Sequence, residues 1–189
     1  FFAETLEDPA IRAKMGAAGR AVLGLDGDGA LHADAVAQDL RGTALAVAVQ
    51  EGGKAAFDAA AKHFRATSDA VLRSQLLSAM GGTEHAALNA RVRALVFEEG
   101  LLRRNEIFPA VGGQMGHAST RPALRQWIDE HFEALEARLA PAGAAVVNGY
   151  SAGMCSEAEA VELQARFEAR MADVEGGPRA LQQAVEEIR

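Results

Sequence analysis

Residues 120–139 read TRPALRQWIDEHFEALEARL, and this stretch carries the clearest indication of fold class. Its large apolar side chains recur every three or four residues, the spacing that places them on one face of an α-helix. Charged side chains fill the positions between them, and Pro122 suits a first helical turn. The stretch therefore predicts helix with an apolar stripe turned toward a core. The stripe consists of Leu124, Ile128, Phe132, Leu135 and Leu139.

The same periodicity recurs at residues 72–80, 88–96 and 163–174, with glycines between the segments that can end a helix. No stretch alternates as a half-buried strand would, and Val146-Val147 is too short to predict one. Roughly ten helices joined by short turns favour antiparallel neighbours. We therefore predict an all-α fold of stacked antiparallel helix pairs, forming a HEAT-like right-handed superhelix. A globular helical bundle is the alternative.

Length and charge narrow the choice of partners. The 189 residues include no linker rich enough to divide them, so we expect a single helical domain over residues 1–189. The net charge of −7, without a basic run, argues against nucleic acid as a partner. No apolar run is long enough to span a membrane, so we expect a soluble protein, either cytoplasmic or exported. The chain begins with Phe1-Phe2 rather than Met, which indicates a piece cut from a longer protein.

The letters WIDEH at residues 127–131 differ from the inverted zinc-protease motif H-x-x-E-H only at Trp127, which cannot bind metal. Glu130 and His131 are neighbours, so they point about 100° apart around a helix. No two of the five histidines are three or four residues apart. We therefore expect no zinc site here, and we expect Asp129, Glu130 and Glu133 to lie on the wet side of a helix.

Two glycine-rich stretches resemble parts of calcium-binding and phosphate-binding loops. LDGDGALHAD at residues 25–34 has acidic residues but fails the EF-hand pattern, because Ala30 and Leu31 occupy ligand and glycine positions. It predicts a turn. AVGGQMG at residues 110–116 lacks the Lys and Ser/Thr of a P-loop. Its glycines either break a helix or admit another backbone, and a loop carrying Gln114, Met115 and His117 could line a groove.

Residues 120–139 resemble part of the C-terminal helical domain of the aminopeptidase N-like, or gluzincin, zinc metallopeptidases. Arg121, Trp127, Phe132 and Leu135 fall at positions typical of that domain. His131 stands where Asn is usual, and Arg125 stands where an aromatic residue is usual. DLRGTALAVAVQEG, VLRSQLLSAMGGTEHAAL, LLRRNEIFPAVGGQMG and CSEAEAVELQARFEARM are similar to its other helices, in the same order.

The resemblance implies a non-catalytic domain at the C-terminal end of an aminopeptidase that removes N-terminal residues from peptides. Zinc would be held by an upstream catalytic domain of the same polypeptide, and no cofactor by this chain. The domain would cover the active site and shape peptide access. No catalytic residue of the family carries over, because neither H-E-x-x-H nor the G-x-M-E-N-type motif occurs here.

Within that role, the substrate channel would include Gln114, Met115, His117 and Arg121, since an arginine can pair with a peptide carboxylate. The plainer interpretation of Arg121 is a surface residue or an ion pair at a helix start. Two other functions stay open on the residues alone. One is a stand-alone HEAT-like scaffold that binds a protein or peptide, and the other is an enzyme with dispersed catalytic residues.

Overall fold

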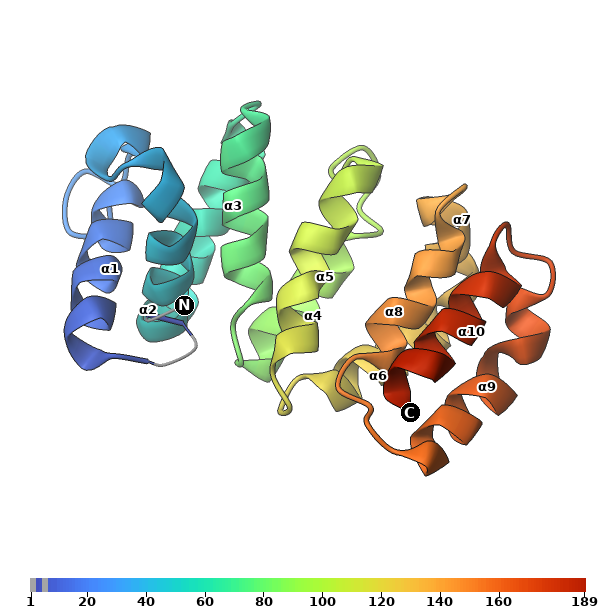
Figure 1. Cartoon of the computed structure of the whole chain (residues 1–189). Helices are drawn as coiled ribbons and strands as arrows, with labels where there is room; N and C mark the ends of the chain where they lie inside the picture. The colour runs from blue at the N-terminus through green and yellow to red at the C-terminus, as the bar shows by residue number, and fades with distance from the viewer. Residues whose placement is uncertain (1–2, 5–6) are drawn as a thin grey trace. The chain divides into compact units, whose positions relative to one another are not determined.

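The computed structural model describes residues 3–4 and 7–189, and every regular element in that part of the chain is a helix, which confirms the all-α prediction. Phe1 and Phe2, where the chain begins without methionine, lie outside the described residues. The helices, shown in Figure 1, are α1 (Pro9–Val22), α2 (Gln38–Ala66), α3 (Ala70–Gly81), α4 (Ala86–Leu95), α5 (Ile107–Gly116), α6 (Arg121–Glu130), α7 (Phe132–Leu139), α8 (Val146–Ser151), α9 (Glu157–Met171) and α10 (Gly177–Ile188), with short 3-10 turns η1 (Ala33–Ala35), η2 (Arg104–Glu106) and η3 (Gly143–Ala145).

The chain divides into two compact units, unit 1 up to Gln114 and unit 2 from Met115 to Arg189. The boundary falls in the last turn of α5, where the sequence contains no linker. None of the described helices is long and apolar enough to cross a membrane.

In unit 1, α2 consists of two antiparallel arms. Gly53 has φ 51° and ψ −134°, a backbone conformation that side chains disfavour, and it separates an arm at 38–52 from an arm at 54–66. Arg41 in the first arm and Phe64 in the second both hydrogen-bond to side chains near the start of α3. A straight helix would hold those two residues about 35 Å apart. The glycines at this point therefore end a helix, as predicted.

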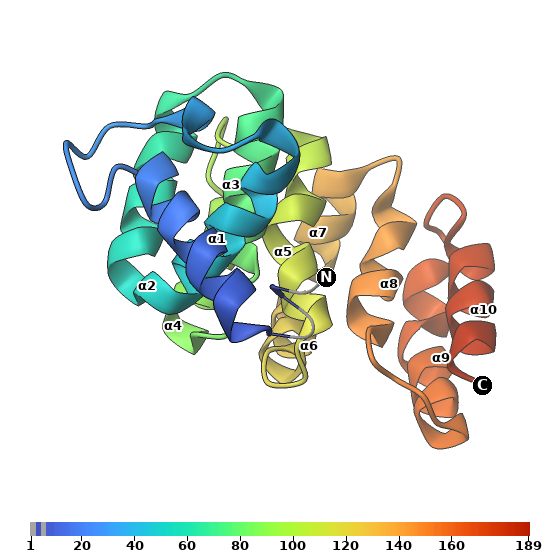
Figure 2. The same ribbon diagram turned by 60° about the vertical axis from the view of Figure 1, so that its left-hand side comes forward.

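The helices of unit 1 form two layers. The second arm of α2 lies beside α4, where Arg91 donates to Asp58 at 2.7 Å. The helix α3 lies beside α5, and Arg73 donates to Glu106 near their starts. One layer thus contains α1, the second arm and α4, and the other contains the first arm, α3 and α5. This arrangement matches the predicted antiparallel pairing within unit 1, while the right-handed superhelix stays a prediction. Figure 2 shows the connection between α1 and η1 projecting as a loop.

Glycines allow α3 and α5 to pack closely. A Cβ on Gly113 of α5 would lie 2.6 Å from the Cα of Gly82, and a Cβ on Gly81 would overlap the carbonyl oxygen of Ala110. Real Cβ atoms do not approach other atoms so closely, so these positions require glycine. The stretch AVGGQMG is therefore helix rather than loop, and admitting another backbone is the alternative that holds.

In unit 2 the predicted stripe is buried from Leu124 to Leu135, but the helix carrying it breaks at His131. The N–H of His131 still donates to the carbonyl of Trp127, and its ψ of 19° then turns the chain into α7. No Gly or Pro marks this break. Val146 and Val147 lie in α8, so the best strand candidate is helical.

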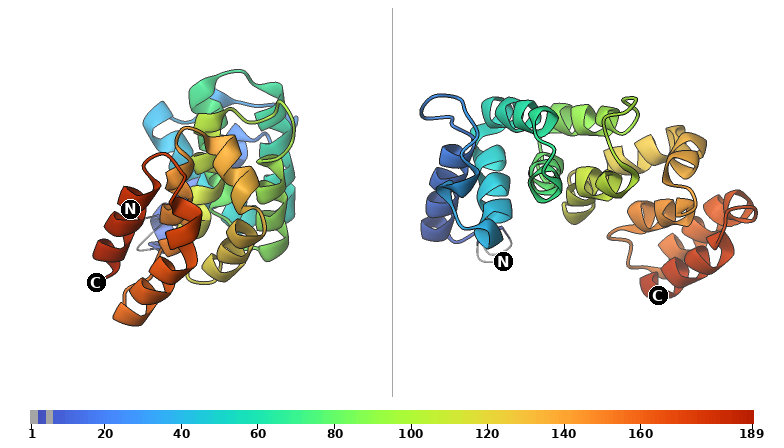
Figure 3. Two further views of the ribbon diagram at one scale, coloured as in Figure 1. Left: turned by 90° about the vertical axis from the view of Figure 1, so that its right-hand side faces the viewer. Right: turned by 90° about the horizontal axis from the view of Figure 1, so that it is seen from above.

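The helices α9 and α10 lie side by side in both views of Figure 3 and complete the core of unit 2. Phe167 of α9 is fully buried, and its ring centroid lies 5.8 Å from that of Phe132 and 4.8 Å from that of Tyr150. At the start of α9, the hydroxyl of Ser156 accepts from the N–H of Glu159 and donates to its carboxylate. These contacts join α9 to α7 and α8 and cap its first turn.

Candidate functional site

Two arginines of α6 bind the ends of other helices. Arg121 donates from Nε to the carbonyl of Met115 at 2.8 Å and from Nη2 to that of Gly116 at 3.2 Å. Arg125, one turn later, donates from Nε to the carbonyl of Tyr150 and from Nη2 to that of Ala152, both at 2.9 Å. The last carbonyls of a helix have no intrahelical partner. Each guanidinium therefore satisfies groups at the end of a helix, α5 or α8, and its charge suits that end of the dipole.

The four residues predicted for a substrate channel divide between the two units. Gln114 belongs to unit 1, is completely buried, and accepts from Arg93 at 2.7 Å. Met115 and His117, in unit 2, are half-buried. Arg121 is half-buried, with its guanidinium turned to backbone carbonyls. The structure thus describes supporting contacts for the first and last of the four, and their role in a channel stays a prediction.

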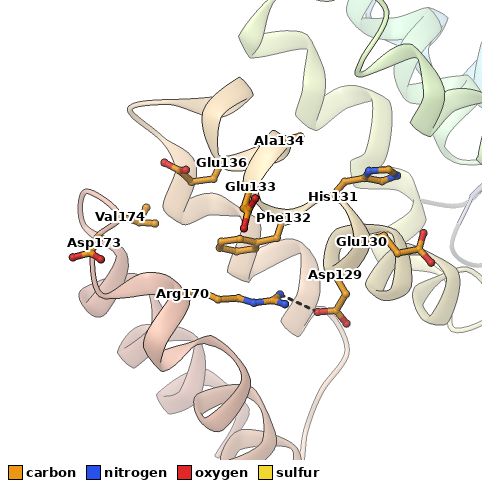
Figure 4. A pocket seen from close by; sticks show the side chains of 10 residues that line it. All are labelled: Asp129, Glu130, His131, Phe132, Glu133, Ala134, Glu136, Arg170, Asp173 and Val174. Carbon is orange, nitrogen blue, oxygen red and sulfur yellow. Dashed lines mark hydrogen bonds and ion pairs between the residues drawn. The ribbon is translucent and has the colours of Figure 1, made fainter.

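A pocket of unit 2 lies elsewhere, where the chain turns at His131 (Figure 4). Its volume is about 520 Å³. Phe132 and Val174 contribute apolar surface to the pocket, and most of its other lining residues carry carboxylates. The lining residues are Asp129, Glu130, His131, Phe132, Glu133, Ala134, Glu136, Arg170, Asp173 and Val174.

Asp129 at the edge of this pocket is a junction between three helices. Its carboxylate accepts from Arg166 at 2.9 Å, from Arg170 at 3.2 Å and from the hydroxyl of Tyr150 at 3.3 Å. The guanidinium of Arg170 also lies 5.1 Å from the ring centroid of Phe132. Asp129 therefore ties α6 to α8 and α9, which is more than the solvated position expected from the sequence.

These contacts perturb the acidity of the chain's single tyrosine. Burial raises the pKa of Tyr150 above its ordinary value of 10.0, and the negative charge of Asp129 raises it further. The nearby charge of Arg166 acts in the opposite direction. The phenol consequently stays neutral, and its hydroxyl group donates a hydrogen bond to the carboxylate of Asp129.

The rest of the pocket is electrically unbalanced. Arg166 and Arg170 compensate Asp129, whereas Glu133, Glu136 and Asp173 have no ion-pair partner among the described residues. Their field favours a cation. Glu133 and Asp173 are exposed, so salt and water screen that field strongly. The described residues also contain no group of three or more His, Cys, Asp or Glu side chains that could hold a metal ion.

The other acidic stretch forms a turn, as predicted. Asp28 accepts from the N–H of Ala30 and contacts Nε2 of His32, each at 2.9 Å. These two contacts lower the pKa of Asp28 below its usual value. Gly24 and Gly29 have the positive φ expected in such a turn.

Sequence reasoning missed the pocket because its walls come from separate segments. Phe132 was predicted as part of the buried stripe, and it is indeed 92% buried. Arg170 carries no local signal, since it lies some forty positions from Asp129 and contacts it only after α9 packs. The break at His131 could not be anticipated either, because the apolar period continues through it.

Comparison with known proteins identifies the family. A search of curated proteins finds no match to the chain. The model of the family described as ERAP1-like C-terminal domain matches residues 3–189. The match covers nearly the whole sequence, and it agrees with the resemblance to the C-terminal domain of aminopeptidase N-like enzymes. The chain therefore belongs to the ERAP1-like C-terminal domain family.

Proposed function

We propose that the chain is the non-catalytic C-terminal domain of a zinc-dependent aminopeptidase, where it covers the active site and shapes the access of peptides. The observation that carries the proposal is the family match over residues 3–189. In this proposal the upstream domain of the same polypeptide holds the zinc and removes N-terminal residues from peptides. Packed helix pairs suit the covering role, because a rigid wall can exclude water from a reaction chamber without taking part in chemistry.

Peptide contact in this proposal falls to the residues before α6. Met115 and His117 are half-buried, so a peptide can reach them with little rearrangement. Gln114 and Arg121 would act through their neighbours, since the first is buried against Arg93 and the second binds backbone carbonyls.

The first experiment measures the mass of the native gene product by immunoblot with an antibody raised against this chain. A band several times larger than the 19.8 kDa of the chain is the expected result. A band near 19.8 kDa would overturn the proposal and favour the stand-alone scaffold.

The second experiment tests peptide access in the full-length enzyme. His117→Ala should change KM for long peptides more than for an aminoacyl amide, because the amide does not extend into the channel. Glu187→Gln, an exposed position of α10, is the control. Equal effects of His117→Ala on both substrates would contradict the assignment of this segment to the channel.

A further inference from the structure

The pocket at His131 is built from three segments of unit 2. The end of α6 and the start of α7 line it, together with the last turn of α9 and the residues that follow. Its volume of about 520 Å³ lies in the range of pockets that enclose a small ligand. All of its lining residues belong to unit 2, so the pocket is complete within one compact body.

This pocket already holds one guanidinium, that of Arg170. The carboxylate of Asp129 accepts a hydrogen bond from it at 3.2 Å, and the ring centroid of Phe132 lies 5.1 Å from its central carbon. Figure 4 shows the side chain reaching from α9 past Phe132 to Asp129, whereas Glu130 points away from it. A carboxylate and an aromatic ring both attract a guanidinium. The chain itself therefore shows which chemistry this wall of the pocket accommodates.

Three further carboxylates of the pocket have no ion-pair partner among the described residues. They belong to Glu133, Glu136 and Asp173. Residues 115–189 contain twelve acidic and seven basic residues, so unit 2 carries a net charge of −5 that adds to the field of these three. A positively charged ligand is therefore favoured, and an anion is disfavoured.

Charge alone does not define the ligand, because salt screens carboxylates as exposed as those of Glu133 and Asp173. Phe132 and Val174 contribute apolar surface to the same pocket. A ligand that uses both kinds of surface carries its positive charge on a hydrocarbon stem. A guanidinium suits the site better than an ammonium, because it is planar, is less strongly hydrated and binds carboxylates through two parallel N–H groups.

We propose that the pocket binds the side chain of an arginine in a peptide, with the guanidinium among Glu133, Glu136 and Asp173 and the methylene groups against Val174 and Phe132. The inference concerns unit 2 alone. It does not depend on the aminopeptidase proposal, and its failure would leave that proposal unchanged.

Titration of the whole chain with N-acetyl-arginine amide tests the pocket, with the NMR shift of the Ala134 amide as the signal, since Ala134 lines the pocket. The shift should saturate with this probe. N-acetyl-citrulline amide has a similar shape without the charge and should not bind, and N-acetyl-lysine amide should bind more weakly by about threefold or more. Absence of a saturating shift, or equal affinity for the arginine probe and either of the others, would overturn the proposal.

Neutralising the three carboxylates should weaken binding of the arginine probe by about tenfold, because each exposed charge pair contributes modestly and three are lost. This variant combines Glu133→Gln, Glu136→Gln and Asp173→Asn. Its matched control removes three exposed acidic charges of unit 2 outside the pocket and should change the affinity by less than about twofold. The control combines Glu168→Gln, Glu186→Gln and Glu187→Gln. Equal weakening in the two variants would indicate a general attraction to acidic surface and would refute the pocket.

Val174→Thr tests the apolar surface of the pocket at nearly constant size and unchanged charge. It should weaken binding of the arginine probe by about threefold, since a hydroxyl replaces a methyl group that contacts the hydrocarbon stem. Val161→Thr, at an exposed position of α9 outside the pocket, is the control and should have no effect. Unchanged affinity in Val174→Thr, or equal weakening in both variants, would contradict the assignment of the stem.

Discussion

Arg73 and Glu106 form a two-bonded ion pair, with Nε 2.6 Å from Oε1 and Nη2 3.0 Å from Oε2. Their side chains are only 10% and 4% exposed. The guanidinium also donates to the carbonyls of Phe64 and Leu101 and lies 4.1 Å from the centroid of the Phe64 ring. One pair of charges therefore joins the end of α2, the start of α3 and the turn before α5.

Removing one partner should be costly. Glu106→Gln leaves the charge of Arg73 buried without its counterion, and such losses cost about 3–5 kcal/mol. The measurement is the free energy of unfolding in urea. Glu98→Gln breaks a similar but half-exposed pair with Arg65, so its effect should be much smaller. Equal losses in the two variants would show that burial is not what makes the Arg73 pair important.

The same pair predicts an acid sensitivity. The hydrogen bonds from Arg73 hold the pKa of Glu106 below its ordinary value of 4.5, with help from the N–H of Arg103 and against the effect of burial. The unfolded chain therefore binds this proton more readily, so the stabilisation is complete above pH 4.5 and is lost as the pH falls through the folded value. Urea unfolding at a series of acidic pH values should show a shallower pH dependence for Glu106→Gln. Identical slopes would contradict this assignment.

Because α3 and α5 pack closely, glycine-to-alanine substitutions in α5 should affect stability differently at different positions. Gly113→Ala should destabilise the chain by about 1–3 kcal/mol, because the new methyl group meets the backbone of Gly82. Gly116→Ala, in the same helix, has open space and should be neutral or stabilising by up to about 1 kcal/mol. Thermal unfolding of the two variants compares them directly. A neutral Gly113→Ala would mean that the two helices separate easily.

Tyr150 can be titrated without interference, because it is the only tyrosine of the chain. Asp129→Asn should lower the pKa of the phenol toward its ordinary value of 10.0, since the charge that opposes its ionisation is gone. Part of the elevation should remain, because burial is its largest single cause. Ultraviolet absorbance follows the ionisation. Glu162→Gln should change the pKa less, because Glu162 is a weaker cause of the elevation than Asp129 and accepts no hydrogen bond from the phenol, and the reverse order would be inconsistent with the junction at Asp129.

The sequence predicted the helices well where the signal is local. Ser156 and Glu159 lie three residues apart and form the expected cap, and the stripe from Leu124 to Leu135 is buried as its period indicates. Features that arise only on packing were not foreseen. Nothing near Gly113 in the sequence shows that Gly82 will approach it. The sequence alone therefore could not decide whether the glycines of residues 110–116 break a helix or allow a neighbouring backbone to pack closely.

The candidate site likewise combines features that have a local signal in the sequence with features that arise only when the helices pack. Arg121 was singled out by a family pattern and by its position at a helix start, but its direction toward the carbonyls of α5 depends on how the chain turns at His117. Arg170 and Asp129 approach each other only through the docking of α9. The charge of each residue and the spacing of apolar residues can be read from the sequence, whereas the convergence of side chains from separate helices depends on the tertiary structure.

The single-residue connection at Gly53 limits where the chain can change in length. An inserted residue there that is taken up by the helix of the second arm would turn that arm by about 100° about its axis and carry Phe57, now 1% exposed, away from the core. The projecting loop between α1 and η1 is longer than one residue, and a Cβ added at Gly27 in it would meet no atom within 4 Å. Evolution and engineering should therefore find insertions tolerated at Gly27 and rejected at Gly53.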